Sequence, residues 1–344
     1  MQAIQIPAHG DPSVLALVDL PVPRPAEGEV LLKVLAVSVN HLDLWVRRGM
    51  PGVKLPLPMI PGCDGIGEIV QLGAGVTGLR PGQRVVIEPG YSSGASAHDL
   101  AGNDHLSDDY QIRGEHSDGL DCEYVAVPAR YALPLPAGVD PVRAAAMPLV
   151  FLTAWGLLIT RAQLQAGESV LVLAGTSGVG SAAIQIARDR GARVFATVGS
   201  EAKMRLARDL GADEVIDHSK ADWPQALRKL PAGRGVDVVV EHVGPATWEG
   251  SLRVLARNGR LVTCGATTGP KVEVLLPHLF IKNQSILGST MGPRNALPLI
   301  FKGLASGAFH PVIDRVLPLS KVREAHELLE ARKVQGKIVL VPGS

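Results

Sequence analysis

Short apolar runs separated by Pro and Gly dominate the first third of the chain. They include VLLKVLAVSV (30–39), GIGEIVQLG (65–73), RVVIEP (84–89) and CEYVAVP (122–128). Short runs rich in β-branched residues and bounded by turn residues are typical of strands. The pattern predicts a β-rich first domain with tight turns.

The hydrophobic pattern changes near residue 140. Asp140 suits the N-cap of a helix, and Pro141 suits its first turn. From about residue 150, strand-length and helix-length segments alternate. The strand-length segments are largely apolar and lie at 169–175, 192–199, 236–244 and 259–265. Apolar strands separated by helices indicate an α/β domain with a parallel sheet covered on both faces.

Beyond about residue 290, the pattern predicts one amphipathic helix and one closing strand. The helix is SKVREAHELLEARKV (320–334), and the strand is KIVLVP (337–342). We expect both elements to return to the first domain.

The composition of this 344-residue chain excludes several classes of protein. Its 34 Lys and Arg nearly balance its 33 Asp and Glu, so a net charge of +1 leaves no basic excess for nucleic acid. Hydrophobic residues make up 46% of the chain, which is too much for a disordered protein. The length suits two domains with separate cores.

The location expected from the sequence is cytoplasmic. The first residues, MQAIQIPAHGDPSVLAL, lack a positive region followed by an unbroken apolar stretch. No later segment has the roughly 18 apolar residues of a membrane span, so we expect no membrane partner. Cys63, Cys122 and Cys264 are odd in number and far apart, which argues against a disulfide framework and fits a reducing compartment.

A glycine-rich turn connects the strand at 170–174 to a predicted helix. Its sequence is Gly175-Thr176-Ser177-Gly178-Val179-Gly180, with Ser177 at the second Gly position of the dinucleotide fingerprint. Glycines let the backbone approach a pyrophosphate, and the amides and dipole at a helix N-terminus favour its charge. We predict that these six residues bind a dinucleotide; the alternative is a glycine-rich turn without a ligand.

The end of the next strand indicates which dinucleotide is bound. NAD-binding domains place an acidic residue there to bind the ribose 2′-hydroxyl. This chain has Gly199, Ser200 and Lys203 instead, which offer an amide, a hydroxyl and a cation for a 2′-phosphate. We therefore predict NADPH. The alternative is that Ser200 only caps the helix and Lys203 is a solvated charge.

Four segments give the chain a family resemblance over essentially its whole length. They are NHLDLWVRRG (40–49), PGCDG (61–65), FLTAW (151–155) and GKIVL (336–340). With them the chain resembles the medium-chain dehydrogenase/reductase superfamily, in its quinone oxidoreductase-like branch. The resemblance implies a GroES-like β-rich catalytic domain (1–149 and 289–344) and a Rossmann domain with a doubly wound parallel sheet (150–288).

The resemblance places Asn40, Cys63 and Leu149 where zinc alcohol dehydrogenases of this superfamily have Cys, His and Cys ligands. Leu149 has no donor, and a neutral Asn amide is a poor zinc ligand. We therefore predict no metal in the catalytic site. A substitute site built from His41, Cys63 and Asp64 is the alternative.

A polar lobe follows the first strands of the β-rich domain. Relatives often carry four structural-zinc cysteines there, and the resemblance places Ser93, Ser96, Asp99 and Ser107 at those positions. We expect a mobile, solvated loop that has lost its structural zinc. The alternative is a metal held by members of the set His98, Asp99, Asp104, His105, Asp108 and His116.

Without zinc, the reaction should suit acceptors whose developing oxyanion needs little Lewis-acid help, such as quinones and α,β-unsaturated carbonyls. The resemblance implies that Asn40 lies beside the nicotinamide and donates to the substrate carbonyl. It implies that Thr153 approaches the nicotinamide and that Trp45 forms an apolar wall. The alternatives are a turn amide for Asn40 and simple packing for Trp45.

Three further residues complete the predicted cofactor site: His242 and Gly265, each at the end of a predicted strand, and Lys337 of the GKIVL segment. Two acidic residues, Asp43 and Asp64, are expected to be structural and to pair with Arg47 or Arg48. The Cys63 thiol is expected to be unreactive because the adjacent carboxylate of Asp64 disfavours the thiolate.

These inferences predict an NADPH-dependent, zinc-independent reductase of small quinones or enones. An alcohol or carbonyl dehydrogenase, or a catalytically weak NADPH-binding sensor or structural protein, are the alternatives. The resemblance also implies a homodimer formed through Ser285–Ser289, a predicted edge strand without charge or proline.

Overall fold

The protein forms two compact units in this computed structural model, which describes residues 1–50, 52–220, 222–229 and 235–343. The first unit comprises Met1–Leu149, Pro293–Gly307 and Pro311–Ser344. The second comprises Val150–Gly292 and Ala308–His310. The sequence-based division placed the boundaries at 149/150 and 288/289.

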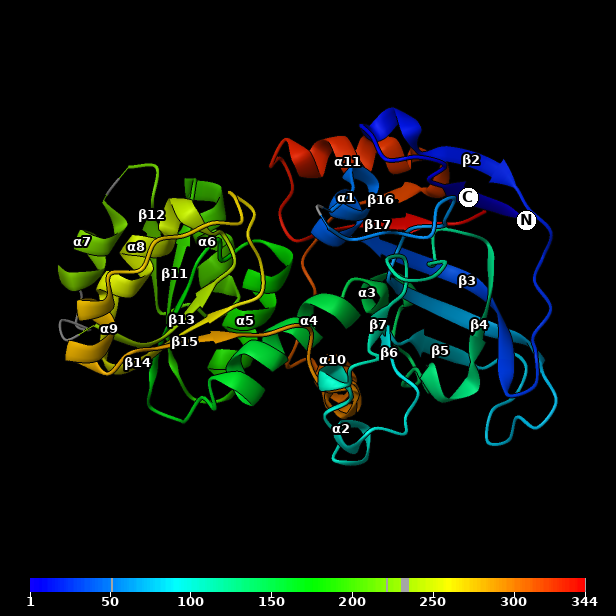
Figure 1. The fold of residues 1–344 in the computed structure, drawn as a ribbon, viewed down its shortest axis with the longest axis horizontal. Coiled ribbons are helices and arrows are strands. Elements are labelled where there is room, and N and C mark those ends of the chain that lie inside the picture. Colours follow the sequence, from blue (N-terminus) through cyan, green and yellow to red (C-terminus); the bar gives the residue numbers. More distant parts are fainter. Residues whose placement is uncertain (51, 221, 230–234, 344) are drawn as a thin grey trace. The chain divides into compact units, whose positions relative to one another are not determined.

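The first unit is built on a seven-stranded sheet (Figure 1). Its order is β16 (Ile313–Pro318), β17 (Lys337–Val341), β3 (Glu29–Val39), β4 (Asp64–Leu72), β5 (Arg84–Ile87) and β9 (Ala132–Pro134), with β8 (Tyr124–Pro128) also paired to β3. β3 therefore lies between the C-terminal strand β17 and β4, antiparallel to both. Its apolar residues pack into one core with those of the neighbouring strands.

Smaller elements surround this sheet. They are the strands β1 (Gln2–Gln5), β2 (Ala16–Asp19), β6 (Gly90–Tyr91) and β7 (Gln111–Ile112), and the helices α1 (His41–Arg48), α2 (Ala97–Leu100), α3 (Pro141–Ala145), α10 (Leu297–Ser306) and α11 (Val322–Glu330). As predicted, α11 and β17 belong to the first unit although they lie near the end of the chain.

The second unit contains a six-stranded sheet whose neighbouring strands are all parallel. Its order is β12 (Glu214–Asp217), β11 (Arg193–Val198), β10 (Ser169–Val172), β13 (Val236–Glu241), β14 (Leu255–Thr263) and β15 (Ser285–Gly288). Counted along this unit, the order is 3-2-1-4-5-6, which is the Rossmann arrangement. The predicted doubly wound parallel sheet is confirmed.

Helices alternate with these strands (Figure 1). They are α4 (Pro148–Trp155), which begins in the first unit, α5 (Gly178–Asp189), α6 (Glu201–Asp209), α7 (Trp223–Lys229), α8 (Pro245–Val254) and α9 (Leu276–Lys282). The strand order reverses direction at β10, and ligands of such sheets bind at the carboxyl ends of strands next to this reversal. The turn between β10 and α5 lies there.

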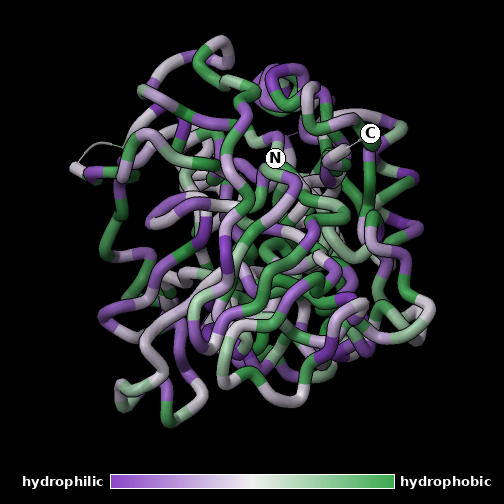
Figure 2. Tube along the Cα trace, turned by 90° about the vertical axis from the view of Figure 1, so that its right-hand side faces the viewer, coloured by the Kyte–Doolittle hydropathy of each residue, from purple (hydrophilic) through white to green (hydrophobic). Residues whose placement is uncertain are grey.

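Hydrophobic and hydrophilic residues alternate in short stretches along the trace (Figure 2). No helix in the described ranges is long and apolar enough to cross a membrane.

A buried arginine joins α1 to α11 in the first unit. Arg47 is 1% exposed; its Nη1 donates to His326 Nδ1 at 3.2 Å, and its Nη2 pairs with Glu330. Arg48 Nη2 also lies 2.7 Å from Glu330 Oε1. The expectation that Arg47 or Arg48 pairs with Asp43 or Asp64 is therefore wrong, because both arginines are turned toward α11.

The buried histidine of this cluster makes the stability of the protein depend on pH. Burial and the nearby Arg47 lower the pKa of His326 to about 3. The unfolded chain binds a proton near the usual value of about 6.5, so the free energy of unfolding should fall as the pH falls from there toward 3.

We expect His326→Gln to remove this pH-dependent part of the free energy of unfolding. A glutamine oxygen can accept the Arg47 hydrogen bond without titrating. Thermal melts at successive pH values below neutral should show wild type losing stability faster than the variant, by up to about 1.4 kcal/mol per pH unit. His98→Gln, at an exposed position, is the control. Parallel curves for wild type and His326→Gln would contradict the assignment.

Candidate functional site

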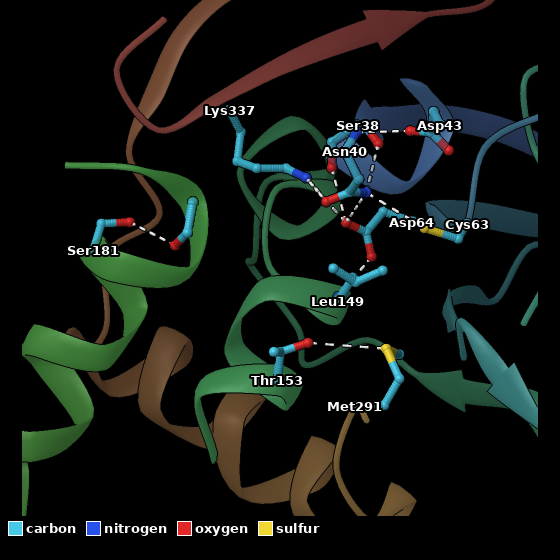
Figure 3. Close-up of polar contacts among 11 residues, drawn as sticks. Ser38, Asn40, Asp43, Cys63, Asp64, Leu149, Thr153, Ser181, Met291 and Lys337 are labelled. Atoms are coloured by element: carbon cyan, nitrogen blue, oxygen red, sulfur yellow. Dashed lines mark hydrogen bonds and ion pairs between the residues drawn. The ribbon is translucent and has the colours of Figure 1, made fainter. Parts of the chain in front are cut away.

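The predicted phosphate-binding turn begins α5 with backbone amides that have no partner. Ser177 caps the helix, and its Oγ accepts from Gly180 N at 3.0 Å. Ser181 Oγ donates to Gly178 O at 2.9 Å within the first turn (Figure 3). Within the described part of the chain, the amides of Gly178 and Val179 make no hydrogen bond. Free first-turn amides on a helix, here of twelve residues, favour the binding of an anion.

Packing requires a glycine at position 180 and leaves little room for a side chain at Gly175. A Cβ on Gly180 would collide with the carbonyl oxygen of Ala174, which itself adopts a left-handed φ of 47°. A Cβ on Gly175 would lie 3.0 Å from Ala196 Cβ and 3.1 Å from Ile184 Cδ1. Both glycines thus allow α5 to start close to the end of β10.

The end of β11 holds the residues predicted to choose the dinucleotide. Ser200 caps α6, with Lys203 N donating to its Oγ at 3.4 Å, so the helix-capping alternative describes its position in the structure. The Ser200 hydroxyl hydrogen is not used by this cap. His218 also lies here, with its Nε2 3.2 Å from a Cβ placed on Gly199. Sequence reasoning missed His218 because it follows the adjacent strand, β12.

The end of β13 is fixed by its own polar contacts. His242 Nε2 is 2.8 Å from Leu173 O, and burial lowers the pKa of His242, so a neutral ring donates to this carbonyl. Gly265 lies against the His242 backbone, because a Cβ there would be 3.2 Å from His242 O. The fully buried Glu241 accepts from Val243 N at 2.7 Å and from Gly244 N at 2.9 Å. Sequence reasoning gave Glu241 no role, although a carboxylate at a strand end was the available signal.

The remaining predicted catalytic residues have few polar contacts. Thr153 is buried on α4, and its Oγ1 is 3.9 Å from Met291 Sδ (Figure 3). Trp45 is half-buried on α1. The structure assigns neither a ligand, so their catalytic roles stay predictions.

A second cluster lies at one end of three neighbouring strands of the first unit. β3 pairs with β17 through Val39 and Ile338, and with β4 through Ser38 and Asp64. This register brings together the end of β3, which leads to Asn40, and the starts of β4 and β17. The side chains that meet there are Ser38, Asn40, Cys63, Asp64 and Lys337 (Figure 3).

The carboxylate of Asp64 is the centre of this cluster. Its Oδ2 accepts from Asn40 Nδ2 at 2.9 Å, from Ser38 Oγ at 3.1 Å and from Lys337 Nζ at 3.3 Å. Its Oδ1 accepts from Leu149 N at 2.6 Å. Asp64 is 0% exposed and Lys337 4%. The cationic partner of Asp64 is thus Lys337, whose predicted contact with the cofactor stays a prediction.

The same cluster contains the three positions singled out by the comparison with zinc enzymes. Asn40 Nδ2 is 3.4 Å from Cys63 Sγ, and Leu149 N binds Asp64. Lys337 Nζ donates to Asn40 Oδ1. His41, the first residue of the alternative metal site, is exposed whereas Cys63 and Asp64 are fully buried.

Burial raises the pKa of the other acidic groups near this cluster. It raises the pKa of Asp43 to about 7 and that of Asp121 well above its usual range. The pKa of the Cys63 thiol is raised far above normal by burial and then by the charges of Asp43 and Asp64. Cys63 is therefore a neutral thiol, in agreement with its expected lack of reactivity.

Hydrogen bonds among serines and aspartates connect the parts of the polar lobe. Ser107 Oγ bonds to Ser96 Oγ at 2.8 Å, Asp109 Oδ1 at 2.7 Å and Asp99 Oδ2 at 3.2 Å. Hydroxyl donors, first Ser92 and then Ser96, lower the pKa of Asp99 to about 2. These contacts connect the side chains of the lobe to one another, while His98 and Asp108 are exposed to solvent, and the mobility of the lobe stays a prediction. In the part of the chain the structure covers, no group of three or more His, Cys, Asp or Glu is arranged to hold a metal.

Comparisons with known proteins identify the family. Residues 26–137 match the model of the alcohol dehydrogenase GroES-like domain, and residues 178–306 match that of zinc-binding dehydrogenase. Quinone oxidoreductase from Lama guanicoe is 33% identical over 99% of this chain and 97% of that protein. The chain belongs to the medium-chain dehydrogenase/reductase superfamily.

Two solved structures of this superfamily are similar over nearly the whole chain. One, described as an NAD-dependent alcohol dehydrogenase, has 45% identity and a TM-score of 0.96, with 100% of both chains covered. The other is a cobalt- and zinc-bound thermostable alcohol dehydrogenase from Pyrobaculum aerophilum, with 33% identity, a TM-score of 0.90 and 99% of both chains covered. Membership confirms the GroES-like domain and makes the protein an oxidoreductase.

A medium-chain dehydrogenase/reductase uses a nicotinamide cofactor, and the second unit fits one. The free amides of Gly178 and Val179 would hold its pyrophosphate, and Gly180 leaves the helix start accessible. Ser200, Lys203 and the exposed His218 lie where the adenosine ribose would bind.

The catalytic zinc of the superfamily does not fit this chain. A catalytic zinc needs three N, S or O ligands from the protein and an open position. Leu149 supplies no side-chain donor, and the Asn40 carboxamide is committed to Lys337 and Asp64. Of the three positions, only Cys63 has a side chain left that could act as a zinc ligand.

Replacing Gly180 with Ala tests the nucleotide site. The new Cβ has to displace the Ala174 carbonyl or the start of α5, which misdirects the free amides. We expect at least about tenfold weaker binding of NADH and NADPH in fluorescence titrations. Gly288→Ala is the control, because a Cβ there meets nothing within 4 Å. Unchanged affinity in Gly180→Ala would remove this turn from the proposed site.

Proposed function

We propose that this protein is an NADPH-dependent reductase of quinones or α,β-unsaturated carbonyls that works without catalytic zinc. The observation that carries the proposal is the buried cluster that joins Asn40, one of the three zinc-ligand positions, to Asp64 and Lys337. A cationic side chain and hydrogen-bond donors, rather than metal ligands, surround this position.

The chemistry of the acceptor follows from this cluster. A bound nicotinamide would supply the hydride. Reduction of an enone or a quinone develops negative charge on an oxygen that a fixed donor or cation can stabilise. Oxidation of a simple alcohol instead requires loss of the hydroxyl proton, which zinc assists by lowering the pKa of the bound alcohol. The cluster therefore favours activated carbonyl acceptors.

The choice of NADPH rests on the end of β11. Gly199 and Ser200, rather than an acidic residue, directly follow β11, and Ser200, Lys203 and His218 are available for a 2′-phosphate. Likeness to the NAD-dependent alcohol dehydrogenase at 45% identity favours a second candidate, an alcohol dehydrogenase using NAD. The third is a catalytically weak NADPH-binding protein, which the same turn would serve.

A second copy of the chain is the proposed partner. β15 is the edge strand of the parallel sheet and carries no charge or proline. Large apolar side chains at and just before α9 are exposed in the second unit: Leu275 (60%), Leu276 (65%), Phe280 (66%) and Ile281 (57%). An unpaired strand edge beside an apolar patch suits a homodimer. Three free cysteines accord with a cytoplasmic location.

Turnover of purified, metal-analysed protein tests the function. NADPH and NADH oxidation would be followed with 1,4-benzoquinone and 2-cyclohexenone, and NADP⁺ and NAD⁺ reduction with ethanol. We expect metal-free protein to reduce at least one acceptor with NADPH. Activity confined to the alcohol and proportional to bound zinc would favour the alcohol dehydrogenase, and nucleotide binding without any turnover would favour the binding protein.

The dimer is tested by light scattering during size-exclusion chromatography. We expect wild type to elute at twice the monomer mass and Phe280→Glu to shift toward the monomer, because a buried unpaired charge disfavours association. Leu299→Glu, at an exposed apolar position on α10, should leave the mass unchanged. A monomeric wild type would refute the proposed partner.

A further inference from the structure

The carboxamide of Asn40 has no hydrogen left for a substrate. Its orientation is fixed by chemistry, because the ammonium of Lys337 only donates and the oxygens around Nδ2 only accept. Nδ2 donates to Asp64 Oδ2 at 2.9 Å and to Ser38 O at 3.2 Å. Two amide hydrogens thus meet two oxygen acceptors. Asn40 would have to break a buried hydrogen bond to serve as the predicted donor.

The hydroxyl of Ser38 is also committed, since its Oγ donates to Asp64 at 3.1 Å. The Cys63 thiol is neutral and a weak donor. Lys337 differs, because an ammonium has three hydrogens and only two partners here, Asn40 Oδ1 and Asp64 Oδ2. No third partner is found among the residues that the structure describes.

Asp64 supports a positive charge on Lys337. Four donors surround its carboxylate oxygens, and hydrogen bonds of this kind stabilise a negative charge. The ion pair with Lys337 is buried, at 0% and 4% exposure. A cation held in this low-dielectric setting interacts strongly with any further negative charge brought next to it.

We propose that Lys337, and not Asn40, donates the hydrogen bond to the acceptor oxygen. This inference rests on the proposed function and deepens it by naming the residue that donates a hydrogen bond and a proton to the acceptor. Asn40 and Asp64 are then positioning residues, which hold the ammonium through two of its three hydrogens. The arrangement suits acceptors that become oxyanions, namely quinones and enones.

The proton balance of this role is complete. As the acceptor is reduced, one oxygen gains negative charge next to Nζ. An N–H bond of Lys337 breaks, and an O–H bond forms on the hydroquinone or enol. Lys337 is left as a neutral amine and recovers its proton from water. The ammonium thus supplies the charge stabilisation and the proton, while the hydride comes from the nicotinamide.

Binding of an unreactive oxyanion tests the proposal without turnover. The full-length protein, saturated with NADP⁺, would be titrated with 4-nitrophenolate and with the neutral 4-nitroanisole, and binding followed by absorbance. We expect wild type to prefer the phenolate by about tenfold or more, the gain of one charge-assisted hydrogen bond. Lys337→Met should lose the preference, and Lys337→Arg should keep part of it.

Three variants make the comparison specific. Asn40→Leu should weaken the phenolate preference less than Lys337→Met does, because it removes one support of the ammonium and leaves its charge in place. Lys333→Met, at an exposed position nearby in sequence, is the matched control. Because Lys337→Met leaves Asp64 unpaired, the double variant Lys337→Met/Asp64→Asn removes both charges and provides a second test with a balanced interior.

The outcomes separate this proposal from its rivals. Loss of the phenolate preference in Lys337→Met and in the double variant, with NADPH affinity within about threefold of wild type, supports it. A wild type without any preference, or loss in Asn40→Leu but not in Lys337→Met, overturns it. A tenfold loss of NADPH affinity in Lys337→Met would make Lys337 a cofactor residue instead.

Kinetics add a second readout. We expect Lys337→Met to lower kcat with the acceptor by about 100-fold or more, as loss of an oxyanion donor does, with Lys337→Arg partly active. Activity of Lys337→Met close to wild type would overturn the proposal and leave the reductase function intact. If wild type reduces no acceptor, the proposed function fails, and the phenolate titration still decides the role of Lys337.

Discussion

Asp64 is a carboxylate that no water reaches, so the chain itself has to stabilise its charge. The side chains of Ser38, Asn40 and Lys337 and the backbone N–H of Leu149 do so together. Breaking a buried ion pair by removing one partner costs about 3–5 kcal/mol. The ends of β3, β4 and β17 and the start of α4 are therefore tied to one buried charge.

This constraint accounts for the chemistry assigned to the cluster. Asp43 and Asp121 are also buried, and burial raises the pKa of both carboxyl groups. Burial thus disfavours a negative charge on these two carboxyls, and the charges of Asp64 and Lys337 balance each other. A neutral cluster is less costly to bury than an unpaired ion, and it still presents one ammonium hydrogen. The ion pair thus serves the fold and the proposed reaction at once.

Sequence reasoning worked best where local pattern decides the structure. Continuous apolar strands between helices predicted the doubly wound sheet. The glycines from Gly175 to Gly180 predicted the turn after β10, where the strand order reverses. His218 and Glu241 were missed because their roles depend on neighbouring strand ends meeting at one edge of the sheet. The hydrogen bonds within the polar lobe were not predicted, because its serines and aspartates meet only after the lobe folds.

The role of Lys337 shows why local pattern was insufficient in the first unit. Lys337 and Asp64 are 273 residues apart in sequence, and a lysine at the start of a strand has no local signal for its partner. The predicted partner of Asp64 was an arginine from the nearby helix α1, but that helix turns Arg47 toward α11. The antiparallel register of β17 on β3 instead brings Lys337 to Asn40. Strand pairing thus brings Lys337, the proposed donor to the acceptor oxygen, to the site. A shift of β17 by one residue would turn this lysine to the other face of the sheet.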